Sequence, residues 1–416
     1  MLYDQLIQSF SSDNAQRVQA MEVFKNQGFP TVKEEDWKYT NIKDIVNQTY
    51  NLQVSSDVSA IDTNAYRIPN LDCELLVFVN GVFSSELSDF QSVEVKPLSQ
   101  AWAENTAEVQ QYWDTLTEKK ESFALLNTAL ATEGVFVHIP KAKAMSKPIY
   151  TVYLTTEQQF SQVRNLIIIE PRAEVSLIEQ HLSTNSQAVL TNAVTEIVVG
   201  EEAHLKYYKI QNDSKDSSLI DNTFIVQKAK SNATVFTFSF EGKIVRNNLN
   251  FYHEGEYLQA NMFGVAFIKG STLVDNHTFI DHKVPNCESN EWYKSIYDES
   301  ARGVFNGKVL VDPEAQKTNA YQQNDNVLLS EKASIDTKPQ LEIFADDVKC
   351  SHGCTVGQLD ETGLFYLRQR GIPEKEARAL LLFAYTSAIL EKVENKPIKE
   401  YINKIIANRL EVDLDF

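Results

Sequence analysis

Three short stretches decide the fold: EPRAEVSL at residues 170–177, GEEAHLKY at residues 200–207 and KSNATVFT at residues 230–237. Each stretch joins a polar corner to an alternating, strand-like segment, with one small residue between the two. These small residues, Ala173, Ala203 and Ala233, follow one another at intervals of 30 residues. A fixed period of this length is typical of a stacked β-solenoid, in which each turn buries its inner face against the next. The sequence therefore predicts a mainly β fold with a solenoid core.

Similar corners at Ala315 and Ala333 extend the pattern toward the C-terminus. A β-sandwich is the alternative fold, because its strands also alternate at regular spacing. Sandwiches usually carry more glycine turns than the 14 glycines of this chain allow. The glycine content therefore favours the solenoid.

Helical patterns precede the solenoid region. Residues 1 to about 50 carry apolar side chains at helical spacing, and residues 101–130 return to a helical composition. Between them, the pair Asn80-Gly81 stands between two apolar runs and is a strong β-hairpin signal. The interpretation is an N-terminal helical domain with a short strand and hairpin segment, residues 1–130.

The character of the chain changes again after residue 360. Pro373, followed by Glu374 and Glu376, begins an amphipathic helix, and Pro397 separates it from a second one. These patterns predict a β core at residues 131–360 and a C-terminal helical domain at residues 361–416. The apolar faces of the two helices must pack on the solenoid or on a partner.

Composition and charge limit the possible partners. The formal charge is -18, from 57 acidic and 39 basic side chains, so the chain repels nucleic acid and anionic membrane surfaces. The longest apolar run, residues 379–390, is shorter than the roughly 20 residues that a membrane helix needs. The first ten residues contain no basic region of a signal peptide. We expect a cytoplasmic protein whose four cysteines are reduced thiols.

Common catalytic templates are absent from the sequence. There is no GxGxxG motif, and the segment GVFNGK at residues 303–308 is one residue short of a phosphate loop. The chain is therefore not expected to hydrolyse nucleotides itself. His277 and His282 are five residues apart on an expected strand, which puts them on opposite faces and makes a metal pair improbable.

The stretch DVKCSHGCTVGQLD at residues 347–360 contains the strongest chemical signal. On a strand, Cys350, His352 and Cys354 point to one face and offer soft ligands suited to iron, zinc or copper(I). Three ligands spread along one strand rarely reach a single ion, so further donors would have to come from elsewhere, such as another subunit. The alternative is that both cysteines fill apolar space and His352 ends the strand.

The same stretch resembles a signature of the SufD family, scaffold subunits of the SUF iron–sulfur cluster assembly complex. The similarity covers nearly the whole chain in order, and its further matching segments are EDWKYT at 35–40, LVFVNGVF at 76–83, FALLNTAL at 123–130, GVFVHIPK at 134–141, DNHTFIDHKVPNCES at 275–289 and GVFNGKVLVDPEAQKTNAYQQNDNVLLS at 303–330.

The resemblance implies a right-handed parallel β-helix core flanked by N-terminal and C-terminal helical domains. It also implies a non-catalytic scaffold that pairs with a SufB-like scaffold and binds a SufC-like ABC ATPase, mainly through its C-terminal helices. Cys350 and His352 match the family's cysteine and histidine near the interface with SufB, where a transient iron–sulfur cluster is assembled. The isolated chain is expected to bind no cofactor stably, and a homodimer is possible when the partner is lacking.

This chain departs from the family pattern at two positions. Cys354 stands where the family usually has a small residue, so no shared role is assigned to it. Leu367, in the segment FYLR at 365–368, stands where SufB-like chains have the cysteine of a similar FYC segment. Cys287 matches a family position and is interpreted as a buried structural thiol. Two other functions remain open at this point: a polysaccharide-active β-helix enzyme and a simple zinc-binding protein centred on CSHGC at residues 350–354.

Overall fold

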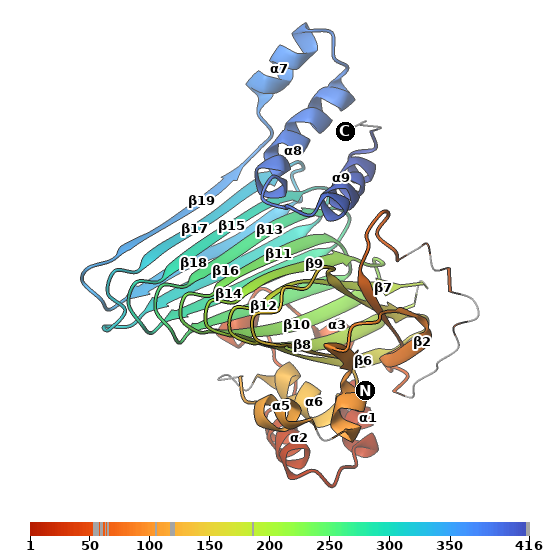
Figure 1. Ribbon diagram of the computed structural model, residues 1–416. Coiled ribbons are helices and arrows are strands. Elements are labelled where there is room, and N and C mark those ends of the chain that lie inside the picture. The colour runs from red at the N-terminus through yellow and green to blue at the C-terminus, as the bar shows by residue number, and fades with distance from the viewer. Residues whose placement is uncertain are drawn as a thin grey trace.

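The computed structural model is an elongated β-solenoid with helices before and after it in the chain, one group packed on each of its two sheets (Figure 1). It describes residues 1–52, 58, 61, 62, 64, 66–104, 106–116, 121–184 and 187–412. Residues 105 and 117–120 of the expected helical stretch, and residues 413–416 of the expected C-terminal domain, lie outside the described part.

The described helices divide into an N-terminal and a C-terminal group. They are α1 Leu2–Ser9, α2 Ala15–Gln27, the 3-10 helix η1 Glu35–Trp37, α3 Lys43–Val46, α4 Leu98–Ala103, α5 Ala107–Tyr112, α6 Ser122–Leu130, α7 Glu361–Gln369, α8 Glu374–Leu390 and α9 Lys396–Leu410.

The strands lie between these groups. They are β1 Glu74–Val79, β2 Val82–Asp89, β3 Val95–Pro97, β4 Val135–Ile139, β5 Ile149–Thr155, β6 Phe160–Ile169, β7 Glu174–Ser183, β8 Val189–Val199, β9 His204–Asn212, β10 Ser217–Gln227, β11 Asn232–Glu241, β12 Ile244–His253, β13 Gln259–Ile268, β14 Leu273–His282, β15 Glu288–Tyr297, β16 Arg302–Val311, β17 Asn319–Leu328, β18 Ser334–Ile343 and β19 Lys349–Gly357.

Successive strands from β4 onward alternate between two sheets. The ten-stranded sheet has the order β19-β17-β15-β13-β11-β9-β7-β5-β1-β2, and the nine-stranded sheet has the order β18-β16-β14-β12-β10-β8-β6-β4-β3. Within each sheet these strands pair in parallel with the strand one turn away, as β9 does with β7 and β11. The predicted solenoid is therefore confirmed, with about eight turns, and the sandwich alternative is wrong. The right-handed winding stays a prediction.

The alanine corners explain how the turns stack. Ala173, Ala203 and Ala233 are completely buried. The backbone N–H of His204 donates to the carbonyl of Ala173 at 2.8 Å, and that of Asn232 donates to Ala203 at 2.9 Å. A small side chain lets one corner lie directly on the next, because interiors are packed too densely to admit a larger one. The 30-residue period seen in the sequence is thus the length of chain that makes one turn of the solenoid.

The N-terminal helices cover the outer face of the nine-stranded sheet (Figure 1). Phe24, Trp37 and Phe123 pack there against a row of apolar side chains from six strands: Phe160, Leu190, Ile220, Ile244, Leu273 and Val304.

The Asn80-Gly81 hairpin also forms as predicted, with φ angles of 49° and 84° and Val79 paired with Val82. Because β1 pairs in parallel with β5, part of residues 1–130 is built into the ten-stranded sheet. The division into three domains stays a prediction.

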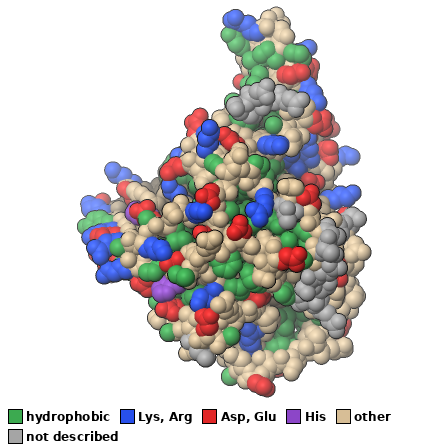
Figure 2. All heavy atoms as spheres, turned by 45° about the vertical axis from the view of Figure 1, so that its right-hand side comes forward, with side chains coloured by type: hydrophobic (Ala, Val, Ile, Leu, Met, Phe, Trp, Pro, Cys, Tyr) green, Lys and Arg blue, Asp and Glu red, His purple; other side chains and the backbone are tan. Residues whose placement is uncertain are grey.

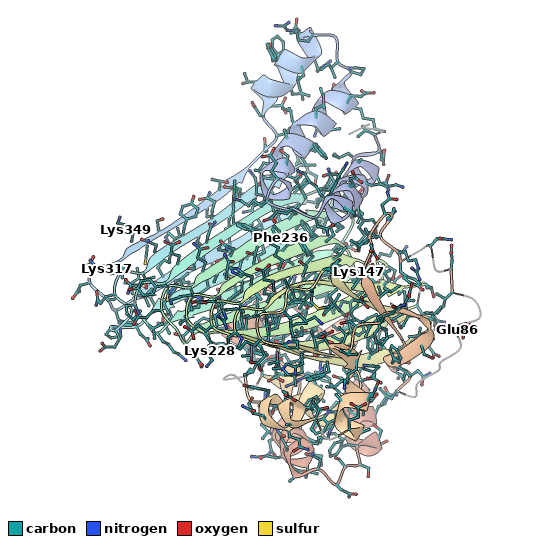
Figure 3. All side chains as sticks on the ribbon, viewed as in Figure 1. Glu86, Lys147, Lys228, Phe236, Lys317 and Lys349 are labelled. Carbon is teal, nitrogen blue, oxygen red and sulfur yellow. The ribbon has the colours of Figure 1, made fainter. Side chains whose placement is uncertain are left out.

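The C-terminal helices α8 and α9 lie on the outer face of the ten-stranded sheet (Figures 1 and 3). An aromatic row lines that face, where the rings of Tyr208 and Phe236 are 5.0 Å apart and those of Phe236 and Phe263 are 5.5 Å apart. Ile398 and Ile402 of α9 belong to the same apolar cluster. The predicted helix after Pro373 begins at Glu374, and Pro397 lies in the first turn of α9. Among the described helices, none is long and apolar enough to cross a membrane.

Two neighbouring histidines are buried inside the solenoid. His253 and His282 are in-register partners on β12 and β14, and their Nδ1 atoms are 3.1 Å apart. The Nε2 atom of His282 lies 2.9 Å from the hydroxyl of Ser289. Burial disfavours the charged form, so it lowers the pKa of both imidazoles, that of His282 to about 3.

We expect the free energy of unfolding to decrease as the pH falls below about 6.5, where histidines of the unfolded chain begin to protonate. The folded-state pKa is lower, so the unfolded state binds more protons and acid favours it. The stability that depends on neutral His282 is complete above about pH 6.5 and declines down to about pH 3. Near pH 5 the loss should be about 2 kcal/mol for His282, at ~1.4 kcal/mol per pH unit.

Urea unfolding near pH 7 and near pH 5 measures this difference. A His282→Gln variant should lose less stability between the two pH values than the unmodified chain does. The exposed His204 is the matched control, and His204→Gln should keep the full pH dependence. An unchanged pH dependence in His282→Gln would contradict the assignment.

Candidate metal site at the open end of the solenoid

The predicted ligand residues lie on β19, the edge strand of the ten-stranded sheet. On one side β19 pairs with β17, and its other edge has no strand beside it in the described part of the chain. Strand β18 holds the same position in the nine-stranded sheet. We call this last turn, β18 and β19, the open end. Figure 3 shows Lys349, the first residue of β19, at the tip of the solenoid.

Cys350 and Cys354 point to the inside of the last turn. Cys350 is the register partner of Ala320, is half-buried and packs against the inner core. Burial raises the pKa of its thiol. Cys354 is exposed, and its Sγ lies 3.3 Å from the Oγ1 atom of Thr337 on β18. Because a thiol binds metal as the thiolate, Cys350 would need an adjacent cation, such as the metal itself, to lose its proton.

His352 lies between the two cysteines. It is the register partner of the buried Gln322, and its own side chain is exposed. By the alternation of a strand it shares the face of Cys350 and Cys354, as the spacing predicted. The last turn therefore presents an imidazole and a thiol where no further turn of this chain covers them in the described residues.

The three side chains of β19 do not form a closed site by themselves. In the described residues, one group of three possible ligands has its atoms within 4.8 Å of one another, and it is Glu179, His181 and Asp221. The prediction that Cys350 and His352 bind metal stays untested, as does any role for Cys354. Their placement is consistent with donors supplied by another chain.

The buried group on β7 and β10 was not found from the sequence. His181 Nε2 is 3.1 Å from Glu179, and Lys209 Nζ is 2.5 Å from Asp221. Glu179 and Lys209 are register partners one turn apart, so the 30-residue period was the signal that could have found them. Each carboxylate has a nitrogen partner, so the group is arranged as two buried pairs.

Cys287, predicted to be a buried structural thiol, is completely buried. Its Sγ donates to the carbonyl of Gly255 at 3.3 Å, and burial raises its pKa to about 11.

His277 is on the opposite face of β14 from His282, and its Nε2 donates to Asp275 at 2.9 Å. The expectation that His277 and His282 are no metal pair agrees with this arrangement.

Exposed apolar side chains gather at two places. At and beside the open end they are Tyr321, Ile343, Phe344 and Val356, with Phe344 62% exposed. On α7 and α8 they are Phe365, Tyr366 and Leu380, with Phe365 65% exposed. We call the second group the helical tip. Figure 1 shows α7 projecting away from the solenoid, and Figure 2 shows hydrophobic side chains on this projection among charged ones.

The fold and the open end define a class: a β-solenoid whose last turn has no further strand beside it in the described residues, followed by a helix that projects away from it. Comparison with known proteins makes this specific. The model described as SUF system FeS cluster assembly, SufBD core domain, matches residues 152–385, and that of the SufBD protein N-terminal region matches residues 3–151. The chain therefore belongs to the SufBD family, and the resemblance stated from its motifs is confirmed.

Named relatives align over almost the full length. An iron–sulfur cluster assembly SufBD family protein of Synechocystis sp. is 33% identical over 407 residues, which cover 94% of this chain and 89% of the relative. The iron–sulfur cluster assembly protein SufD of Escherichia coli is 29% identical, with coverage of 95% and 92%. SufD of Bacillus subtilis is 25% identical, with coverage of 95% and 93%. Membership of this family supports a role in iron–sulfur cluster assembly.

Proposed function

We propose that the chain is a non-catalytic scaffold subunit of the SUF machinery. In this proposal it pairs with a SufB-like scaffold through the open end and binds a SufC-like ABC ATPase through its C-terminal helices. A nascent iron–sulfur cluster is built transiently between the two scaffolds, and the isolated chain holds no cofactor stably. The complex works in the cytoplasm, and its solenoid is right-handed, as nearly all parallel crossover connections are.

The single observation that carries the proposal is the position of Cys350 and His352 on the uncovered last turn. Edge strands such as β18 and β19 have free backbone N–H and C=O groups and pair readily with another chain. A related solenoid docked there would cover Phe344 and Val356 and bring its own donors to the incomplete ligand set. Without that partner, a second copy of this chain fits the same edge, which makes a homodimer the expected form in isolation.

The helical tip supports the second partner. Phe365 and Tyr366 are more than half exposed on the first helix after the solenoid, whereas the neighbouring Leu364 is buried. Large aromatic side chains are enriched at protein interfaces, where a few residues supply most of the binding energy. The chain itself lacks a phosphate loop, so nucleotide hydrolysis would belong to the ATPase subunit.

Replacing both aromatic residues of the helical tip should release the ATPase. We expect the Phe365→Ser/Tyr366→Ser variant to bind the SufC-like subunit at least about tenfold more weakly, because interface aromatics commonly contribute ~2 kcal/mol or more each. Its melting temperature should stay unchanged, since neither side chain is buried. Titration calorimetry with the purified ATPase measures the affinity.

Val93 provides the matched control, because it is 83% exposed and lies in the N-terminal part of the chain. Val93→Ser should leave the affinity for the ATPase unchanged. Equal affinities of the double variant and the unmodified chain would show that the helical tip is not the ATPase-binding surface.

A further inference from the structure

One carboxyl group inside the solenoid has no basic partner. Glu291 lies on the inner face of β15 and is 1% exposed. No basic side chain among the described residues contributes to its environment, in contrast to Glu179 and Asp221. Burial raises the pKa of Glu291 to about 7. An isolated buried charge is costly, so this carboxyl must be neutralised by a proton or by a cation.

Polar side chains from neighbouring strands are arranged around Glu291. Gln322, its register partner on β17, donates from Nε2 to Glu291 Oε2 at 2.7 Å. Thr278 on β14 lies beside the same carboxyl group. Gly307, the register partner of Thr278, leaves room for the amide: a Cβ at Gly307 would lie 2.3 Å from Gln322 Nε2.

Three oxygen atoms of this group are buried without a hydrogen-bond partner among the described residues. They are Oε1 of Glu291, Oε1 of Gln322 and Oγ1 of Thr278. Buried polar atoms of folded proteins nearly always have a partner, so a ligand bound by these three oxygens would complete the group. A carboxylate, an amide carbonyl and a hydroxyl are the ligands that hard divalent cations prefer.

We propose that Glu291, Gln322 and Thr278 bind a hard divalent cation inside the solenoid. This site goes beyond the proposed function, because it lies within one chain and needs neither a partner subunit nor the thiols of β19. Gln322 stands between Glu291 and the exposed His352 in one register row, so Glu291 lies two strands behind the edge strand β19.

Manganese(II) is the probe for this site, because it takes oxygen ligands and is detected by electron paramagnetic resonance. The full chain, freed of metal by a chelator, should bind Mn²⁺ in the solenoid and gain thermal stability on binding. Glu291→Gln should lose this binding and its thermal shift. Without metal the variant should be at least as stable as the unmodified chain, because it no longer buries an unpaired acid.

Two further variants keep the test specific. Glu288→Gln removes the same charge from an exposed position on the same strand and should bind Mn²⁺ normally. Gly307→Ala should displace the Gln322 amide and weaken binding about tenfold or more, as loss of a supporting contact does at metal sites. Absence of Mn²⁺ binding to the unmodified chain, or equal binding by Glu291→Gln, would overturn the proposal and leave a proton as the neutralising group.

Discussion

Replacing Arg164 by methionine should lower the free energy of unfolding by about 3–5 kcal/mol, the range observed when one partner of a buried ion pair is removed. Arg164 and Glu196 are both completely buried on the outer face of the nine-stranded sheet, with the guanidinium NH2 2.5 Å from Glu196 Oε2. Asp114 lies 3.4 Å from the same nitrogen, and the guanidinium is 4.8 Å from the ring centroid of Trp113. The arginine therefore fixes the segment around α5 to the solenoid.

The loss of stability follows from the negative charge that remains buried on Glu196. Without Arg164, the carboxylate of Glu196 would stay buried, with two backbone donors among the described residues, the N–H groups of Asp114 and Leu116 at 3.0 and 3.1 Å. The double variant Arg164→Met/Glu196→Gln removes both charges and keeps an oxygen for these donors, so it should recover most of the stability. Guanidinium unfolding, followed by tryptophan fluorescence and by circular dichroism, measures the difference.

A control at the surface separates this effect from the loss of any positive charge. Lys230 pairs with Glu202 at 3.4 Å where both side chains are about half exposed, and Lys230→Met should change stability by less than about 1 kcal/mol. If Arg164→Met were as stable as Lys230→Met, the N-terminal helices would not depend on this ion pair.

The second large effect is expected at the open end. If His352 is an interfacial ligand as proposed, His352→Ala should reduce iron–sulfur enzyme maturation about tenfold or more in a strain that depends on this chain. Even supporting contacts of metal ligands contribute about 10–100-fold to affinity, so removal of a ligand should have at least that effect. Aconitase activity in cell extracts measures maturation.

The neighbouring Ser351 is the matched control, because it is exposed on the same strand but points to the opposite face. Ser351→Ala should mature clusters normally. The His352→Ala protein should keep its melting temperature, since the imidazole is exposed and contributes little to folding. Normal maturation with His352→Ala would exclude the ligand role and leave the family membership unaffected.

Local patterns allowed much of the fold to be predicted. The alanines at 173, 203 and 233 marked stacked corners, and Asn80-Gly81 marked a hairpin, because both depend on short-range geometry. The helix after Pro373 was predicted from its first turn and its apolar spacing. These features need only residues that are close in sequence or separated by one fixed period.

The contacts that could not be predicted join the N-terminal helices to the solenoid, or one turn of the solenoid to the next. Arg246 was not singled out in the sequence, yet it lies 3.9 Å from the ring centroid of Trp37 and pairs with Asp275 at 2.6 Å. His253 and His282 become neighbours because β12 and β14 are one turn apart in exact register. Such contacts depend on the lengths of the turns between strands. These lengths vary along the chain and form no recognisable sequence motif.

For the candidate site, the sequence predicted one face of a strand but not its surroundings. Cys350 and His352 do share a strand and a face, as their spacing indicated. Their exposure depends on β19 being the last strand and on α7 projecting away instead of covering it (Figure 1). The sequence did not show that Glu291 has no basic neighbour among the described residues, because that depends on how the folded interior is packed.

Anaerobic purification of the tagged chain from its own cytosol, with identification of the bound proteins and of iron, tests the central claim most directly. The account predicts recovery with a SufB-like scaffold and a SufC-like ATPase, with iron present in the complex and little in the chain alone. Loss of the scaffold partner on Val356→Arg, at the open end, should accompany loss of iron. Recovery of the chain alone with one equivalent of zinc would contradict the account and favour a simple zinc-binding protein.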